Sequence, residues 1–501
     1  MKKYLSKIFA RVVLSREKKY YDSPHDAQRD VLSRLLKKAS RTVYGREHSM
    51  DRIHDYEAYR GNVPVVTYDD LRPYIERIAS GEKDVLYPGR PAYFAKTSGT
   101  TSGSKYIPLT SCGLRHQIKS TRNMLLRYIL KTGNIDYVGG KMIFLQGSPA
   151  LEEKNGIKIG RLSGIVAHHV PAYLQSNRKP SFSTNCIEDW ERKVEAVVDE
   201  TVGENMTLIS GIPSWLQMYF ERLMNRSGKK IGELYPHFSL MVTGGVSYEP
   251  YRVRFEEMIG RKVDILQTYP ASEGFIAASD SPNADDMLLE VHSGIFYEFI
   301  PVEEYGTANA RRLPLWEVEE GVNYAVILTT DSGLWAYSIG DTVMFTSRKP
   351  YRVRVTGRVA HFTSAFGEHV IGKEVEQAIG VACSKTGAIV REFTVAPMVT
   401  PSEGLPYHEW VVEFEKTADL QDFARCVDEE MQKQNVYYKD LIEGKILREA
   451  VISSVSKGAF DAYLKSVGRL GGQNKLPRLS NDRRIADSMS QYIIESNIKT
   501  L

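Results

Sequence analysis

Short apolar segments alternate with longer amphipathic segments, and this alternation limits the possible folds more than any other feature of the chain. Residues 141–145, 208–210, 240–243 and 263–267 are apolar runs of strand length. Periodic segments between them, such as residues 214–224, predict helices. Because strands that alternate with helices usually pair in parallel, we expect a layered α/β body with largely parallel sheets.

The pattern changes after Gly294. Residues 295–300 and 324–330 predict strands with no long helix between them, which indicates an antiparallel or β-barrel-like part. The last portion of the chain has the strands and helices of a small α+β unit. A chain of 501 residues also exceeds the size of most single cores. We therefore expect a large N-terminal domain over residues 1–357 and a small, mobile C-terminal domain over residues 358–501.

Composition argues against several classes of partner. The 66 basic and 62 acidic residues give a net charge of only +4, which favours neither nucleic acid nor an anionic membrane. The sequence has no run of eighteen apolar residues, so we expect no membrane span. Four widely spaced cysteines predict reduced thiols in a cytoplasmic protein. The histidines and cysteines lack zinc-ligand spacing, so the sequence predicts no structural metal, and a monomer is the default expectation.

Residues 97–105 are the segment richest in functional information. They read Thr-Ser-Gly-Thr-Thr-Ser-Gly-Ser-Lys, with six hydroxyls and two glycines before Lys105. Such a loop can surround a polyphosphate with backbone N–H groups and hydroxyls, while the lysine adds positive charge. It is not a Walker A loop, because three residues separate Gly99 from Gly103 and Tyr106 follows the lysine. A mobile surface loop is the alternative interpretation.

Four further segments carry polar groups at places where ligands bind. Glu273 follows the predicted strand 263–267, and a carboxylate beyond the carboxyl end of a strand can hold Mg²⁺ on a nucleotide. Asp341 can accept hydrogen bonds from both hydroxyls of a ribose. Arg358 follows Gly357, and Lys475 lies in a loop of glycines and proline. Taken singly, each is also typical of a solvated loop.

Taken together, the order and spacing of these five motifs resemble those of the acyl-adenylate-forming superfamily, which includes acyl-CoA synthetases, luciferases and adenylation domains. Within it, the chain is most similar to the acyl-acid amido synthetases of the auxin-responsive Gretchen Hagen family, and in particular to their bacterial relatives. The resemblance covers roughly residues 26–490. Its main segments are residues 94–101, 269–273, 296–301, 333–341 and 471–482.

The resemblance implies a role for each matching residue. The ATP-binding residues would be Thr97, Ser98, Gly99, Thr100, Thr101, Ser102, Gly103, Gly244, Gly245, Val246, Tyr269, Ser272, Asp341 and Arg358. The phosphates would lie against the first loop, the adenine along Gly244 to Val246 and Tyr269, and the ribose at Asp341. The catalytic residues would be Lys475, Glu273 and Lys105, with Glu273 also carrying Mg²⁺.

Candidate substrate contacts are less specific. Trp215 and Tyr219 lie on a helix that resembles the family's acyl-pocket wall, although an aromatic stripe at helical spacing is also typical of a core. Arg122 is a candidate contact for the substrate carboxylate. The pair His168-His169 resembles that of acyl-condensing domains but has Tyr173 where those need an aspartate.

The implied function is an ATP-dependent ligase. A carboxylic acid and ATP with Mg²⁺ would give an acyl adenylate, which an amine, by the resemblance an amino acid, would convert to an amide and AMP. Transfer to coenzyme A is one alternative, and an inactive nucleotide-binding protein is another, which the intact Glu273, Asp341 and Lys475 argue against. Two departures from the family pattern are Ala336, where an arginine is common, and Ala360, where an aspartate hinge is common.

Overall fold

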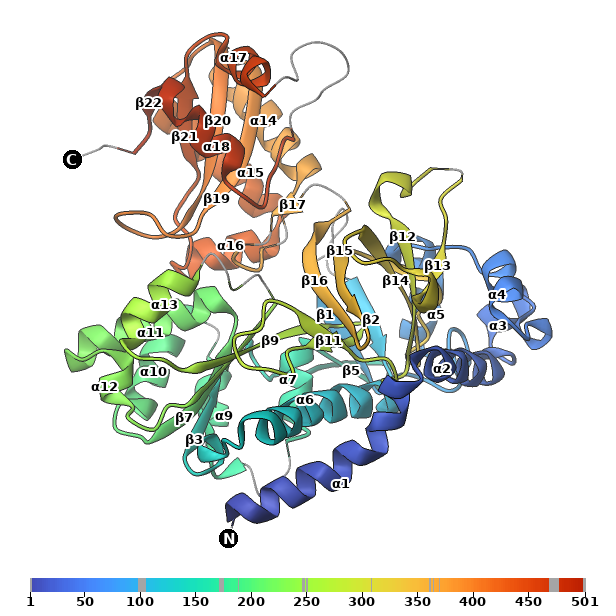
Figure 1. Cartoon of the computed structure of the whole chain (residues 1–501). Helices are drawn as coiled ribbons and strands as arrows, with labels where there is room; N and C mark the ends of the chain where they lie inside the picture. Colours follow the sequence, from blue (N-terminus) through green and yellow to red (C-terminus); the bar gives the residue numbers. More distant parts are fainter. Residues whose placement is uncertain are drawn as a thin grey trace.

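The computed structural model describes residues 2–97, 105–170, 175–187, 189–245, 248, 251–307, 309–359, 362–363, 365–368, 370–467 and 477–498. A twelve-stranded mixed sheet is its framework, with the strand order β13-β12-β14-β15-β16-β11-β10-β9-β8-β7-β3-β6 (Figure 1). The parallel strands are β6 (Arg178–Lys179), β3 (Lys141–Phe144), β7 (Met206–Gly211), β8 (Leu240–Gly244) and β9 (Asp264–Ala271).

The antiparallel strands continue the same sheet. They are β10 (Gly274–Ala278), β11 (Met287–Leu289), β12 (Ile295–Pro301), β13 (Leu313–Pro314), β14 (Asn323–Thr330), β15 (Tyr337–Arg348) and β16 (Tyr351–Arg358). Strand β9 pairs in parallel with β8 and antiparallel with β10, so the two halves meet there. The predicted change of pattern after Gly294 is confirmed, and β12 and β14 pair directly.

Helices cover both faces of the parallel half, which explains its almost continuous apolar strands. On one face, α6 (Ser111–Thr132) packs against strand residues such as Leu208 and Leu240. On the other face, Ile209 and Met241 pack beneath α10 (Trp190–Thr201), α11 (Pro213–Ser227) and α13 (Arg252–Ile259). Short helices nearby are α7 (Leu162–Ala167), α9 (Phe182–Asn185) and α12 (Ile231–Leu234).

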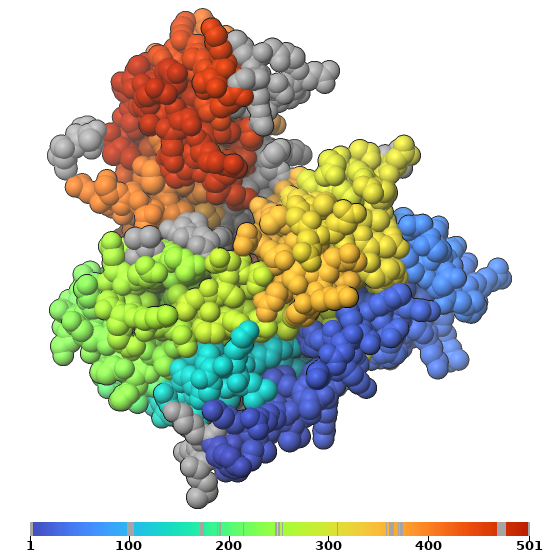
Figure 2. Space-filling model, in the orientation of Figure 1, coloured from blue at the N-terminus to red at the C-terminus, as the bar shows by residue number. Residues whose placement is uncertain are grey.

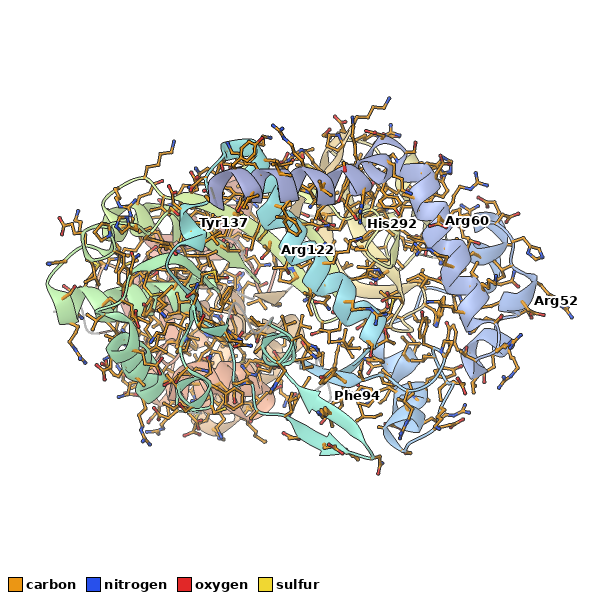
Figure 3. The ribbon with its side chains drawn as sticks, turned by 90° about the horizontal axis from the view of Figure 1, so that it is seen from below. Arg52, Arg60, Phe94, Arg122, Tyr137 and His292 are labelled. Carbon is orange, nitrogen blue, oxygen red and sulfur yellow. The ribbon has the colours of Figure 1, made fainter. Side chains whose placement is uncertain are left out.

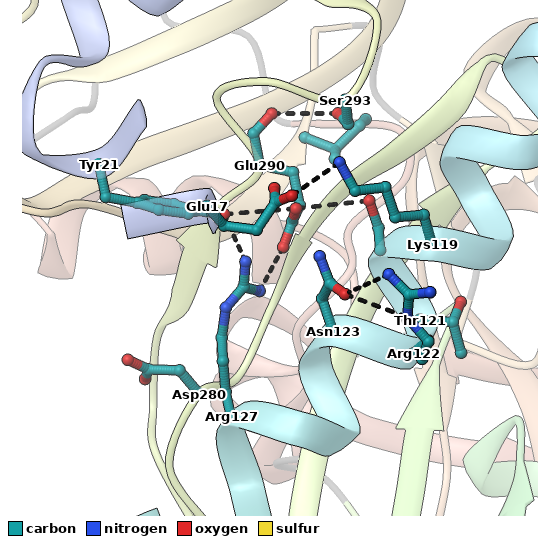
Figure 4. Close-up of polar contacts among 12 residues, drawn as sticks. Glu17, Tyr21, Lys119, Thr121, Arg122, Asn123, Arg127, Asp280, Glu290 and Ser293 are labelled. Atoms are coloured by element: carbon teal, nitrogen blue, oxygen red, sulfur yellow. Dashed lines mark hydrogen bonds and ion pairs between the residues drawn. The ribbon is translucent and has the colours of Figure 1, made fainter. Parts of the chain in front are cut away.

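The N-terminal helices pack against the antiparallel half, except the first, which lies mainly along α6 (Figure 1). They are α1 (Lys2–Asp22), α2 (Pro24–Ala39), α3 (Val43–Glu47), α4 (Tyr56–Asn62) and α5 (Tyr68–Ala79). Helix α1 lies against α6 and is joined to it by polar contacts (Figure 4). Glu17 pairs with Lys119 at 2.8 Å, and Arg127 contacts both Tyr21 and the buried Glu290. These contacts fix α1 beside the rest of the large body.

A second, four-stranded sheet lies in the large body, in the order β2-β1-β5-β4. Its strands are β1 (Tyr93–Thr97), β2 (Lys105–Leu109), β4 (Glu152–Lys154) and β5 (Ile157–Gly160). Antiparallel pairing of β1 with β2 sets Thr97 opposite Lys105. Both ends of the hydroxyl-rich segment are therefore fixed side by side.

The C-terminal portion stands over the large body (Figures 1 and 2). It begins at the pair β17 (Phe362–Thr363) and β18 (Val370–Ile371). Its main sheet has the order β19-β20-β21-β22. The strands are β19 (Ile389–Met398), β20 (Tyr407–Lys416), β21 (Val451–Val455) and β22 (Ile493–Ser496), and the helices are α14 (Gly372–Thr386), α15 (Leu420–Gln434), α16 (Val436–Glu443), α17 (Ala459–Ser466) and α18 (Arg484–Met489). This is the predicted α+β arrangement. Among the described residues, no helix combines the length and apolar character that crossing a bilayer requires.

Candidate active site

A cavity of about 2840 Å³ extends from the carboxyl ends of the parallel strands to the C-terminal portion. Its walls include β1 and β2 at one side, β8, β9 and β15 at the centre, and Phe366 and α16 on the far side. Among the predicted site residues, the cavity is lined by Thr97, Lys105, Arg122, Trp215, Gly244, Gly245, Tyr269, Ser272, Glu273, Asp341 and Arg358. Residues from motifs that are widely separated in the sequence therefore line the same cavity.

A hydrogen-bonded network joins three of these residues. The Tyr269 hydroxyl donates to Asp341 Oδ2 at 2.7 Å, and Arg358 Nε lies 2.5 Å from Asp341 Oδ1. Asp341 and Arg358 are direct partners across β15 and β16, so the sheet register brings them together. Arg358 also donates to the Ile339 carbonyl at 3.0 Å. The Asp341 carboxylate is thus held in a defined position at the cavity wall.

Glu273 and Ser272 form the two-residue turn between β9 and β10, because Ala271 and Gly274 are paired. The turn carries the Glu273 carboxyl into the cavity lining. Burial raises the pKa of Glu273, while the neighbouring Lys105 opposes this shift. The pKa of Lys105 is lowered, chiefly by burial. Without a ligand, the site therefore disfavours both charges, and a bound cation beside Glu273 or a bound anion beside Lys105 would restore them.

Gly244 and Gly245 bring the end of β8 close to β9. A Cβ atom on Gly244 would lie 2.3 Å from Thr268 Oγ1 and 2.8 Å from its carbonyl oxygen, so no side chain fits there. Gly245 has a φ of +85°, which favours glycine. The two glycines therefore present backbone without side chains to the cavity.

The predicted substrate residues separate into two groups. Arg122, which lies on α6 (Figure 3), and Trp215, on α11, line the cavity. Tyr219 does not. Its side chain is fully buried, and its hydroxyl lies 2.8 Å from Thr201 Oγ1 on α10 and 3.4 Å from the Tyr235 hydroxyl. The prediction for Tyr219 is therefore corrected. Tyr219 lies one turn of α11 away from Trp215, on the side of the helix that faces α10 and not the cavity.

Some predicted residues lie outside the described residues, namely Ser98, Gly99, Thr100, Thr101, Ser102, Gly103, Val246 and Lys475, together with Ala360 and Tyr173. The other departure, Ala336, is fully buried at a φ of +44°. Its N–H donates to Thr329 Oγ1 and its carbonyl accepts from Val66. Ala336 therefore shapes the turn before β15.

The cavity also contains basic residues that the sequence did not single out. Lys193 on α10 is buried, which lowers its pKa to about 8, and donates to the carbonyls of Gln146 and Asn185 at 2.9 and 2.8 Å. Arg178 lies in the same wall with its pKa lowered by burial. The hydrophobic pattern around Lys193 and Arg178 predicts secondary structure and no binding motif, so no signal in the sequence indicated these two residues.

Comparison with protein families matches three domain descriptions along the chain. Residues 14–185 match the GH3 family N-terminal domain, residues 288–358 the GH3 family central domain, and residues 373–484 the GH3 family C-terminal domain. Together these matches cover well over half of the chain.

Full-length relatives have low identity. A jasmonoyl–L-amino acid synthetase, JAR6, from Nicotiana attenuata is 22% identical, with 94% of each chain covered. The indole-3-acetic acid-amido synthetase GH3.3 from Arabidopsis thaliana is 20% identical, with 94% of this chain and 92% of the relative covered.

Solved structures show the same fold. The GH3.15 acyl acid amido synthetase superposes with a TM-score of 0.62 at 18% identity, covering 97% of each chain. A 2-hydroxyisobutyryl-CoA ligase superposes with a TM-score of 0.57 at 16% identity, covering 93% of this chain and 92% of the other. The chain therefore belongs to the GH3 family, with the N-terminal, central and C-terminal domains in that order.

Proposed function

We propose that this protein is an ATP-dependent ligase that activates a carboxylic acid as an acyl adenylate and transfers the acyl group to an amine, forming an amide. The observation that carries the proposal is the joint placement of the Tyr269–Asp341–Arg358 network, Glu273 and Lys105 along one cavity. The names of the GH3 relatives, which are amido synthetases for acids and amino acids, support the same chemistry.

In the first half-reaction, an acid carboxylate attacks the α-phosphorus of ATP, and pyrophosphate leaves. Two anions must approach each other, so positioning and countercharge supply most of the catalysis. We assign the ribose to Asp341, the adenine to the wall at Gly244, Gly245 and Tyr269, and the phosphates to Lys105 and Thr97. Lys105 gains a partner for its charge when the phosphates bind, which reverses the effect of burial on its pKa.

Glu273 fits the role of a magnesium ligand. Mg²⁺ is usually bound by one or two carboxylates together with substrate phosphates, and the Glu273 carboxyl lines the cavity close enough to Lys105 to influence its pKa. Bound there, Mg²⁺ would supply countercharge for the phosphates. The Glu273 side chain would orient the ion, and the two-residue turn would keep this carboxylate in place.

In the second half-reaction, the amine attacks the acyl carbonyl and displaces AMP. No covalent enzyme intermediate is needed, because the mixed anhydride is already activated. We assign Lys475 to the first step, delivered by a small domain over residues 358–501 that moves relative to residues 1–357. Arg122 and Trp215 are assigned to the acid. We further propose a monomer in the cytoplasm and a bacterial origin; the free state of all four cysteines supports a reducing compartment.

The product of the second half-reaction tests the proposal. The full-length protein is incubated with ATP, Mg²⁺ and a panel of acids, and then with either an amino acid mixture or coenzyme A. We expect AMP release that depends on the amino acids, with an amide of matching mass. A thioester formed only with coenzyme A would replace the amide proposal with acyl-CoA ligation. Absence of ATP binding by calorimetry would contradict both.

A further inference from the structure

Three side chains with metal-binding atoms meet at a place outside the active-site cavity. Cys112 and His116 lie one turn apart on α6, and Asp331 follows β14. One ligand atom from each residue lies within 4.8 Å of the other two. His116 Nδ1 is 2.6 Å from Asp331 Oδ2, and the Cys112 thiol is hydrogen-bonded to the same carboxyl group. None of the three residues lines the cavity.

The backbone around the cluster leaves room for these side chains. A Cβ atom on Gly294 would lie 2.4 Å from both His116 Nδ1 and Asp331 Oδ2. A Cβ atom on Gly113 would lie 3.0 Å from Asp331 Oδ1. The turn is held in place by Thr110, whose hydroxyl donates to the Asp331 carbonyl at 2.9 Å. The Asp331 carboxylate is therefore fixed against the first turns of α6.

The charge of Asp331 has little compensation. Its side chain is only 8% exposed, and its single ion-pair partner among the described residues is His116. A buried carboxylate is costly unless a cation accompanies it. The Tyr87 hydroxyl is close enough for Asp331 and Cys112 to influence its pKa, and within the described part of the chain this buried hydroxyl has no hydrogen-bond partner. A metal ion with a bound water would satisfy both groups.

We propose that Cys112, His116 and Asp331 bind one divalent transition-metal ion, of the Zn²⁺ type, that fastens the N-terminal end of α6 to the turn between β14 and β15. Thiolate, imidazole and carboxylate form a ligand set that Zn²⁺ accepts and that Mg²⁺, which prefers oxygen ligands, does not. Three protein ligands leave a fourth position for water, a partner of the kind that the Tyr87 hydroxyl lacks among the described residues. The proposed site departs from the expectation of no structural metal, which considered only the spacing of histidines and cysteines in the sequence and not the distant Asp331.

Binding of the metal ion requires only small movements of the ligand atoms and a simple transfer of one proton. Zn–N and Zn–O distances near 2.0 Å in a tetrahedron separate ligand atoms by about 3.3 Å, so the His116–Asp331 contact would open by less than roughly 1 Å. The ion takes the place of the hydrogen bond between His116 Nδ1 and Asp331 Oδ2, so the neutral imidazole carries its proton on Nε2, and Cys112 loses its thiol proton. That one proton goes to solvent, and no electron is transferred.

Cobalt titration tests the site. The untagged, metal-free, full-length protein is titrated with Co²⁺, which reports thiolate ligation by a sulfur-to-cobalt charge-transfer band and tetrahedral geometry by intense visible bands. We expect saturation at one equivalent and displacement by Zn²⁺. Cys112→Ser should remove the charge-transfer band and weaken Zn²⁺ binding at least about 100-fold, since even loss of a residue that only supports a ligand costs 10–100-fold. His116→Gln should weaken binding while the sulfur band remains at saturation.

Matched controls make the result decisive. Cys383→Ser removes another half-buried thiol and should leave the titration unchanged. Far-ultraviolet circular dichroism identifies variants that fail to fold, and Cys112→Ser is the most conservative of the set. Absence of stoichiometric binding by the folded wild-type protein would overturn the proposal. A charge-transfer band that survives Cys112→Ser or disappears in Cys383→Ser would also overturn it.

Discussion

At the scale of single residues, the candidate site depends on carboxylates whose surroundings differ. Asp341 has two partners, the Tyr269 hydroxyl and the Arg358 guanidinium, which hold its carboxylate in place. Glu273 lies in the same cavity, but burial raises its pKa. The Asp341 carboxylate is positioned to accept hydrogen bonds, whereas Glu273 is suited to binding a cation that restores its negative charge.

Asp341→Asn should weaken ATP binding. The substitution removes the countercharge of Arg358 and one carboxylate acceptor, so we expect the Kd for ATP to rise at least about tenfold, since a hydrogen bond to a charged group contributes about 1.5–3 kcal/mol. Calorimetric titration measures this change. Asp286→Asn is the matched control, because Asp286 also pairs with an arginine, Arg352, but does not line the cavity. Equal effects of the two substitutions would contradict the assignment of Asp341.

Glu273→Gln should reduce activity and raise stability at neutral pH. The raised pKa means that the folded protein binds this proton more tightly than the unfolded chain does. The contribution of Glu273 to the free energy of unfolding therefore falls as the pH rises from the pKa of this group in the unfolded chain to its pKa in the folded protein. The substitution should raise the Tm at pH 7 and leave it unchanged at a pH below the unfolded pKa of glutamate. Pyrophosphate release should fall roughly 100-fold or more. A lower Tm at pH 7 would contradict this account.

At the scale of elements, the end of β8 lies close to β9, at the place to which we assign the adenine. Gly244 lies so close to Thr268 on β9 that any side chain would separate the two strands. Gly244→Ala should destabilise the protein by about 1–3 kcal/mol, the usual cost of overpacking, and weaken ATP binding. Gly203→Ala is the control, since a Cβ atom there would meet nothing within 4 Å. Denaturant unfolding measures the stability of both variants, and similar stability of Gly244→Ala and Gly203→Ala would contradict the close approach of Gly244 to Thr268.

The elements also show what the sequence could predict. The strands over residues 141–145 and 240–243 were predictable because helices bury both of their faces, which makes them continuously apolar. The period of α11 indicated a buried stripe, but period alone could not show that Trp215 faces the cavity while Tyr219 faces α10. Helix α1 was not predicted, because both its apolar contacts with α6, such as Ala10, and its polar contacts, such as Glu17 with Lys119, join segments distant in sequence.

The same limit applies to the candidate site. The motifs indicated Glu273 and Asp341, but Asp341 lies inside β15, and the register that pairs it with Arg358 depends on β15 and β16. The contact of Lys193 with the Gln146 carbonyl, and that of Asp331 with the Cys112–His116 pair on α6, join segments far apart in the chain. Such contacts leave no local pattern in a single sequence.

At the scale of the whole molecule, Arg161 connects the large body to the C-terminal portion. Its guanidinium lies 3.2 Å from Asp440 on α16 and over the Tyr437 ring. Arg161 and Asp440 are 41% and 48% exposed, so their pair contributes at most about 1 kcal/mol. A contact made in one arrangement of the domains shifts their equilibrium by its own free energy.

Arg161→Ala should therefore change the Tm little and alter the ratio of the single-turnover rate constants for pyrophosphate release and AMP release by up to about fivefold. Arg226→Ala is the control, because Arg226 is similarly exposed and pairs with Glu195 and Asp199 inside the large body. An unchanged ratio in Arg161→Ala would show that this contact does not distinguish the two half-reactions.

The most direct test of the central claim is isotope exchange between pyrophosphate and ATP, which reports acyl-adenylate formation alone. The account predicts exchange that requires both a carboxylic acid and Mg²⁺ and that is lost in Glu273→Gln but retained in Glu57→Gln, an exposed glutamate paired with Arg60. Exchange that is independent of the acid, or that persists at full rate in Glu273→Gln, would contradict the assignment of this cavity as the site of acid activation.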